Sequence, residues 1–106
     1  MKLTHYILLR EDMTIGQKLA QTTHAAGESF KIPPKIRGAP VYAVCLSVKT
    51  EYDLLKIEMA LQNANIEHVA IREPDEPFCG AITAIGICPV ERSKVKKFLS
   101  NLPLVR

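Results

Sequence analysis

The chain has 106 residues, of which 47% are hydrophobic and 24% charged, and its formal net charge is +3. This length and balance are those of one ordinary globular domain and exclude a second hydrophobic core. No apolar run approaches the roughly 20 residues that span a bilayer, and the N-terminus lacks the long apolar region of a signal peptide. The sequence therefore predicts a single domain over residues 1–106, located in the cytoplasm and without a membrane segment.

The cysteines and the absence of common motifs narrow the chemistry. Cys45, Cys79 and Cys88 are an odd number without a Cys-x-x-Cys pair, which predicts reduced thiols and neither disulfides nor a zinc site. The sequence contains no Gly-x-Gly-x-x-Gly motif, no Walker loop and no His-Glu-x-x-His motif. We therefore predict no cofactor and no metal.

The first two elements are a strand and a helix. Residues 3–10 are rich in apolar and aromatic side chains, which predicts a strand. Thr14 and Gln17 have capping-box spacing and predict a helix over residues 15–29. We expect the apolar side chains of this helix to pack inward and its small residues to form an accessible strip around His24. The inward set is Ile15, Leu19, Ala26 and Phe30, and the strip is Ala20, Thr23, His24 and Gly27.

The remaining elements follow a regular order. Paired prolines make residues 31–40 a loop, and residues 41–48 form a second, largely buried strand. A second helix runs from the Thr50 cap to about residue 65, with Tyr52 and Ala64 on its apolar face. Strands over residues 68–72 and 80–88 are joined by a short connection and should be antiparallel, and a last helix covers residues 90–101. The result is an α/β domain of order βαβαββα with a mixed sheet.

Charge gathers in two places along this order. From Val90 onward there are five basic residues against one acidic residue, so Lys94, Lys96 and Lys97 are candidate phosphate contacts. A lysine-rich outer face of an amphipathic helix is the structural alternative. The connection after residue 72 is acidic and contains Glu73, Asp75 and Glu76.

Two blocks of the sequence resemble one known family. The segment Arg10-Glu11-Asp12 followed by residues 20–26, Ala-Gln-Thr-Thr-His-Ala-Ala, is similar to the first strand and helix of the type-2 peptidyl-tRNA hydrolases. Residues 80–89, Gly-Ala-Ile-Thr-Ala-Ile-Gly-Ile-Cys-Pro, resemble the last strand of that family. The resemblance implies a four-stranded mixed sheet packed between helical layers, and tRNA as the partner. The family precedent and the exposed sheet edges also suggest a homodimer.

The family chemistry implied by this resemblance is metal-independent hydrolysis of the ester that joins a peptide to tRNA. Glu73, or alternatively Asp75, would position or deprotonate water, and His24 would orient that carboxylate or shuttle the proton. Thr83 matches an active-site threonine that would donate to the substrate. Gln21 and Thr23 match positions that line the same pocket. A lone histidine such as His24 is more often an imidazole hydrogen-bonded for structural reasons than a functional group.

The departures from the family define a second hypothesis. The Gly-Lys-Gly-Lys helix start is shortened, so the catalytic Lys falls on Gln17 or, with a shifted gap, on Lys18. The Asp-Ala-Gly after the third strand is replaced by Glu73-Pro74-Asp75. Both changes resemble the divergent branch of peptidyl-tRNA hydrolase domain-containing proteins. The alternative is therefore an inactive homologue that acts as an RNA-binding or protein-interaction module.

Overall fold

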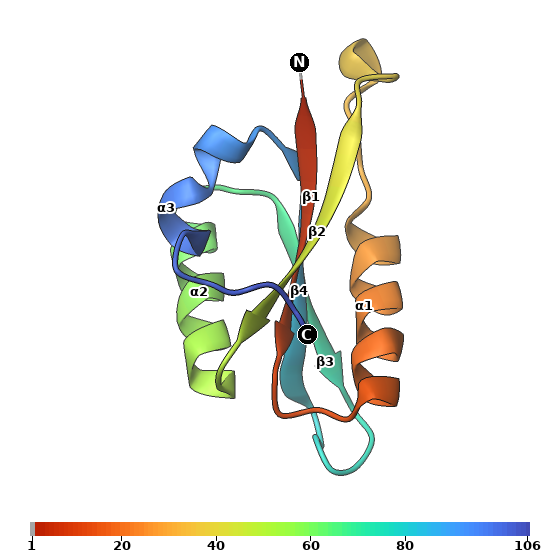
Figure 1. Ribbon diagram of the computed structural model, residues 1–106, viewed down its shortest axis with the longest axis vertical. Helices are drawn as coiled ribbons and strands as arrows, with labels where there is room; N and C mark the ends of the chain where they lie inside the picture. Colours follow the sequence, from red (N-terminus) through yellow and green to blue (C-terminus); the bar gives the residue numbers. More distant parts are fainter. Residues whose placement is uncertain (1) are drawn as a thin grey trace.

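The computed structural model describes residues 2–106 and contains the expected succession of elements (Figure 1). The four strands are β1 (Leu3–Arg10), β2 (Val41–Val48), β3 (His68–Glu73) and β4 (Ala81–Val90). The helices are α1 (Ile15–Ser29), α2 (Glu51–Asn63) and α3 (Lys96–Leu99), with short 3-10 turns η1 (Pro34–Ile36) and η2 (Arg92–Lys94). The predicted βαβαββα order is confirmed.

The four strands form one sheet in the order β2-β1-β4-β3. β1 is parallel to β2, and β4 is antiparallel to both β1 and β3, so β1, β2 and β3 run in one direction. α1 covers one face of the sheet, while α2 and α3 lie on the other (Figure 1). The mixed sheet between helical layers is therefore confirmed.

Alternation along the strands divides the core between the two faces. Tyr6 and Leu8 of β1 pack with Leu54 and Leu61 of α2, while Ile7 and Leu9 pack with Ala25 of α1. Val95 and Leu99, near the C-terminus, are buried on the α2 face. By contrast, Tyr52 and Ala64, expected on the packed face of α2, are exposed. Because the two core clusters lie on opposite faces of the sheet, both faces of the central strands are covered.

The prediction for the inner face of α1 is wrong for Ile15, Leu19 and Phe30, while Ala26 packs against the core as expected. Ile15, Leu19 and Phe30 are 78%, 66% and 56% exposed, and the buried residues of α1 are Gln21, Ala25 and Ser29. Each set lies along one side of the helix, but Ala25 and Ser29 of the second set are small enough for the close approach of α1 to β4. A Cβ atom on Gly86 of β4 would collide with the Ser29 side chain and with the Ala25 carbonyl oxygen. Close backbone packing, rather than hydrophobicity, sets the orientation of this helix.

The end of the chain also differs from the prediction of one helix over residues 90–101. β4 continues through Pro89 to Val90, because the register against β1 shifts between Thr4 and Tyr6 and leaves room for a residue without an N–H donor. The helical part is reduced to η2 and the single turn of α3. The last residues then pair with the outer edge of β2, where Leu46 bridges Leu104. Among the described residues no helix is long and apolar enough to cross a membrane.

Candidate active site

The candidate site lies at the edge where the three parallel strands end. Arg10, Val48 and Glu73 are the last residues of β1, β2 and β3, and β4 begins at the same edge with Ala81. The N-termini of α1 and α2 lie there as well (Figure 1). In α/β sheets the carboxyl ends of parallel strands are where ligands bind, because loops and helix N-termini meet there. The resemblance placed its acidic connection and its helix start at this edge.

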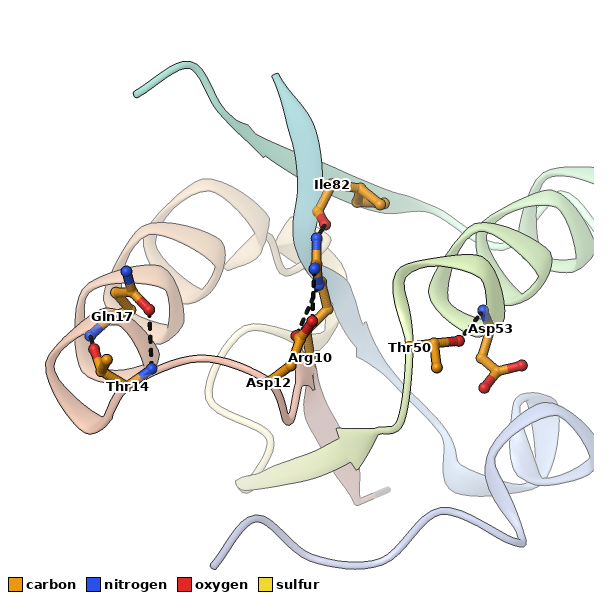
Figure 2. A network of polar contacts seen from close by, with 7 residues as sticks. All are labelled: Arg10, Asp12, Thr14, Gln17, Thr50, Asp53 and Ile82. Carbon is orange, nitrogen blue, oxygen red and sulfur yellow. Dashed lines mark hydrogen bonds and ion pairs between the residues drawn. The ribbon is translucent and has the colours of Figure 1, made fainter. Parts of the chain in front are cut away.

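Arg10, at the end of β1, forms hydrogen bonds to the following loop and to β4 (Figure 2). Its Nε and Nη2 donate to the two carboxylate oxygens of Asp12 at 2.9 and 2.7 Å, and its Nη1 donates to the Ile82 carbonyl oxygen at 3.1 Å. The guanidinium also lies 5.3 Å from the ring centre of Phe78. The hydrogen bond from Arg10 lowers the pKa of Asp12. The sequence signal was the Arg-x-Asp at a strand end, yet neither residue was predicted as part of the site.

A β-bulge points Thr83 toward α1. Ile71 pairs with Ala84 and Arg72 pairs with Ile82, so Thr83 has no partner in the ladder. Ile82 belongs to the core on the α2 face and Ala84 to the core on the α1 face. The extra residue places the Thr83 side chain on the α1 face next to Ala84, where its hydroxyl contacts Gln21. Bulges of this kind redirect side chains near functional sites.

A continuous chain of hydrogen bonds joins Thr83, Gln21 and Glu73. Thr83 Oγ1 lies 2.9 Å from Gln21 Oε1 and donates to it, and Gln21 Nε2 donates to Glu73 Oε2 at 2.9 Å. The ionised Glu73 can only accept, which fixes the orientation of the Gln21 amide and leaves its oxygen facing Thr83. Thr83 is fully buried and Gln21 is 6% exposed, so solvent does not compete for the contact between them.

Within this series of hydrogen bonds, Glu73 is the residue whose side chain reaches the surface. Its other oxygen, Oε1, accepts the Asp75 backbone N–H at 3.1 Å. The Asp75 N–H bond, then the Gln21 bond, and more weakly the nearby His24, lower the pKa of Glu73. Glu73 is therefore ionised at neutral pH. Asp75 is itself exposed, and what it supplies to this chain is its backbone N–H.

The start of α1 lies at the same edge of the sheet. Thr14 Oγ1 accepts from the Gln17 N–H, and Gln17 Oε1 accepts from the Thr14 N–H at 2.9 Å (Figure 2). The predicted capping box is confirmed, and the Gln17 side chain is occupied by it. Capping satisfies two of the four free N–H groups of a helix start and leaves those of Ile15 and Gly16. Lys18, in the first turn, is half-buried.

The other predicted residues of α1 lie outside the hydrogen-bonded chain. His24 is exposed and its Nε2 lies 2.8 Å from Glu28 Oε2, while the Thr23 hydroxyl donates to the Leu19 carbonyl oxygen at 2.9 Å. His24, Thr83 and Glu73 do not open onto one shared cleft. Thr83 is buried beneath Gln21, and His24 faces its neighbour on the helix. Of these three residues, only Glu73 is both accessible to solvent and hydrogen-bonded to Gln21.

The predicted lysines lie in another region. Lys94, Lys96 and Lys97 are exposed on η2 and α3, at the far side of the sheet from α1. Lys94 lines a hollow of about 330 Å³ beside Cys88, and Lys96 lines a separate groove against β1 and β2. Within residues 2–106, no group of three or more His, Cys, Asp or Glu side chains is arranged to hold a metal ion.

Comparisons with known proteins give the family. The model of the family described as Peptidyl-tRNA hydrolase PTH2 matches residues 3–105. The chain belongs to the type-2 peptidyl-tRNA hydrolase family. The peptidyl-tRNA hydrolase of Methanococcus maripaludis is 32% identical over 116 aligned residues, and that of Methanothermobacter thermautotrophicus is 32% identical over 108. Each alignment covers 93% of this chain and 96% of the relative.

A solved structure supports the fold independently. A protein of unknown function from Agrobacterium matches with a TM-score of 0.71, covering 100% of this chain and 99% of the other. The two sequences are only 17% identical, so this likeness concerns the fold alone. Membership of the family thus rests on sequence, and the arrangement of the strands rests on structure as well.

Proposed function

We propose that this protein hydrolyses the ester bond between a peptide, or an N-blocked amino acid, and tRNA, without a metal ion. The observation that supports the proposal is the Thr83–Gln21–Glu73 chain, which ends in an ionised carboxylate at the edge where the parallel strands finish. Ester hydrolysis requires a base that activates water and donors that hold the developing oxyanion. This edge contains candidates for both.

Glu73 is the proposed group that orients and deprotonates water. Each of its oxygens accepts one hydrogen bond from the protein, so each retains a lone pair for a water molecule. The free N–H groups of Ile15 and Gly16 at the start of α1 are the proposed oxyanion donors, because a helix N-terminus favours negative charge. Lys18, one turn into the helix, is the proposed cation in place of the family Lys that Gln17 does not supply.

Thr83 takes a different role from the one that the family resemblance implies. Its hydroxyl hydrogen is occupied by Gln21, and its oxygen is also 3.4 Å from the Ile71 carbonyl oxygen. We assign Thr83 and Gln21 as positioning residues that hold Glu73, not as groups that touch the substrate. His24 and Thr23 flank the site on the exposed face of α1, where His24 can exchange protons with solvent.

The test is release of peptide from an N-blocked aminoacyl-tRNA by the purified protein. Glu73→Gln should abolish turnover, whereas Glu76→Gln, a matched change in the same acidic connection, should leave the rate near wild type. Asp75→Asn separates the two candidate carboxylates, because the backbone N–H of Asp75 remains in place. A wild-type rate for Glu73→Gln, or no turnover by the folded wild type at any pH, would overturn the proposal.

The competing function is an inactive RNA-binding or protein-interaction module. The observation that favours it is Gln17, a neutral side chain engaged in the capping box at the place where the family has its catalytic Lys. Under this alternative, the protein binds uncharged tRNA and peptidyl-tRNA equally and releases no peptide. Lys94 and Lys96, each of which lines a hollow, are the proposed phosphate contacts under either function, whereas Lys97 lines neither of these two hollows.

We further propose a cytoplasmic homodimer. Pairing of described residues covers the outer edge of β2 only near Leu46, so Val41–Val44 offers free backbone groups to a second copy. Light scattering of the purified protein tests this, and Ala43→Pro should give a monomer by blocking the edge. A monomeric wild type at micromolar concentration contradicts it.

A further inference from the structure

A groove lies on the α3 side of the sheet, away from Glu73. Its volume is about 640 Å³, and it is bounded by the N-terminal parts of β1 and β2, by η2 and α3, and by residues 100–104. Thr4 in this groove and Arg10 at the candidate active site are six residues apart on β1, or about 20 Å in an extended strand. The groove is therefore separate from the proposed catalytic edge.

The charges around this groove have one sign. Lys2, just before β1, Arg92 of η2 and Lys96 of α3 all line it. No carboxylate is found among the described residues that line it. The groove between α2 and the end of β2 differs in this respect, because Glu11 and Asp53 balance Lys49 and Lys56 there. Three cations without a counter-charge favour a ligand that carries several negative charges.

The interior of the groove is apolar and aromatic. Tyr6, Leu46 and Leu99 form its buried floor, and the Tyr42 ring is 51% exposed beside them. The Lys2 ammonium lies 5.0 Å from the centre of the Tyr42 ring. An exposed aromatic ring next to cations is the arrangement that binds single-stranded nucleic acid, since bases stack on the ring while phosphates contact the cations.

We propose that this groove binds a single-stranded RNA segment, with a base on Tyr42 and phosphates on Lys2, Arg92 and Lys96. The acyl chain of a fatty acid would fit the apolar floor, but its carboxylate supplies only one negative charge for three cations. An acidic peptide would satisfy the cations but has no flat face for Tyr42. The proposal goes beyond ester hydrolysis, because binding in this groove requires no turnover.

The structure provides close controls for a binding test. Lys96 and Lys97 are exposed neighbours in α3, but only Lys96 lines the groove, while Lys97 lies 5.2 Å from the Phe98 ring. Tyr42 and Tyr52 are exposed tyrosines, each next to a lysine, but Tyr52 lies on α2 outside the groove. Each pair separates a specific contact from a general loss of charge or of aromatic surface.

The experiment measures anisotropy of a fluorescein-labelled, unstructured RNA octamer against the full chain over a range of salt concentrations. Lys96→Gln should weaken binding several-fold and reduce the slope of log affinity against log salt by about 0.7, the value for one phosphate contact on a single strand. Lys97→Gln should change neither. Tyr42→Ala should weaken binding at least about fivefold with the salt slope unchanged, and Tyr42→Phe should restore it.

Three results would overturn the proposal: equal losses for the two lysine variants, no loss for folded Tyr42→Ala, or displacement of the RNA by polyglutamate or palmitate at lower concentration than by unlabelled RNA. Circular dichroism melts establish that each variant is folded. The octamer contains no ester, so failure of RNA binding leaves the proposed hydrolysis untouched. Loss of turnover on aminoacyl-tRNA, conversely, leaves the octamer result untouched.

Discussion

Gln21 Nε2 donates to Glu73 Oε2 at 2.9 Å, so a buried side chain of α1 holds the last carboxylate of the edge strand β3. The two residues are 52 positions apart; pairing with Ala81 of β4 fixes the Glu73 backbone, and the Gln21 amide holds its carboxylate. Thr83 holds the other end of the same amide. This bridge gives a solvent-accessible carboxylate a defined position, which a residue at a strand end otherwise lacks.

Gln21→Leu should impair catalysis through Glu73. Loss of the Gln21 hydrogen bond raises the pKa of Glu73 toward its ordinary value, so the acid limb of the pH–rate profile should move to higher pH. Loss of positioning should also lower the rate at neutral pH by about tenfold or more, less than the 10²–10⁴-fold that complete loss of a general base costs. The rate over pH 3–8, together with the carboxyl NMR titration of Glu73, measures both effects.

Gln62→Leu, an exposed position on α2, is the control for the amide change and should leave both the rate and the titration unaltered. If Gln21→Leu slows turnover but leaves the Glu73 titration where it was, Gln21 acts by another route, such as direct contact with the substrate. An unchanged rate in a folded Gln21→Leu protein removes the positioning role.

His5 should make the protein less stable in mild acid. It is 6% exposed, its Nε2 donates to Ser29 Oγ at 2.7 Å, and burial lowers its pKa below the ordinary 6.5. The Ser29 hydroxyl donates to the Ala25 carbonyl oxygen, so it cannot also donate to His5. The neutral imidazole therefore stabilises the fold above pH 6.5, and this contribution is lost as the pH falls through the folded-state pKa.

Urea unfolding at pH 7.5 and at pH 5.5 measures this contribution. His5→Gln keeps a donor toward Ser29 and should lose less stability between the two pH values than wild type, by at most about 1.4 kcal/mol per pH unit for one proton. His24→Gln changes an exposed imidazole and serves as the control. Identical pH dependence of wild type and His5→Gln would show that burial of His5 does not affect stability.

Two glycines should respond in opposite ways to alanine. Gly86→Ala places a Cβ against Ser29 and the Ala25 carbonyl oxygen, so the free energy of unfolding should fall by about 1–3 kcal/mol. Gly27 lies in the exposed part of α1, and no other atom comes within 4 Å of the position that a Cβ would take there. Gly27→Ala should therefore raise stability by about 0.5–1 kcal/mol. Thermal and urea unfolding of both variants compare them directly.

Ser29→Ala in the Gly86→Ala background removes one of the colliding atoms and should recover part of the loss. Recovery stays incomplete because the Ala25 carbonyl oxygen remains in the way. Destabilisation of equal size in the two glycine variants would show that glycine content, rather than close packing of α1 on β4, determines stability.

The element order was predictable from the sequence because caps and turns leave local signals. The Thr14–Gln17 capping box, the paired prolines before β2 and the short β3–β4 connection each act within a few residues of chain. The orientation of α1 was not predictable in this way. Two stripes of α1 compete for the sheet, and the choice depends on Gly86, which is far away in sequence. Hydrophobicity alone favoured the wrong stripe.

The site shows the same division between local and long-range information. Glu73, Gln21 and Thr83 were named as candidates through the family resemblance, but their order along one hydrogen-bonded chain depends on a bulge that alternation cannot indicate. His24 was placed at the centre because an imidazole on a small-residue strip suggests access to a ligand. Its contact with Glu28 follows from ordinary helix spacing, which was also present in the sequence.

Arg10→Lys should loosen the edge that contains the site. Lysine cannot make the two-pronged contact with Asp12 and also reach the Ile82 carbonyl oxygen, so the free energy of unfolding should fall by about 1–3 kcal/mol. Arg10 also lowers the pKa of Asp12, so the pair stabilises the fold above the ordinary carboxyl pKa and loses this effect as the pH falls through the folded value. The variant should therefore lose less stability than wild type between pH 5 and pH 2.

Arg37→Lys, in the exposed loop after η1, is the matched control and should stay within about 0.5 kcal/mol of wild type. A double-mutant cycle with Asp12→Asn separates the Arg10–Asp12 pair from the Ile82 contact, because only the pair contributes to the coupling energy. Ile82 precedes Thr83, so loosening this contact should also reduce turnover of aminoacyl-tRNA. Full activity and full stability in Arg10→Lys would mean that the Arg10 charge is sufficient and that its two-pronged geometry has no role at this edge.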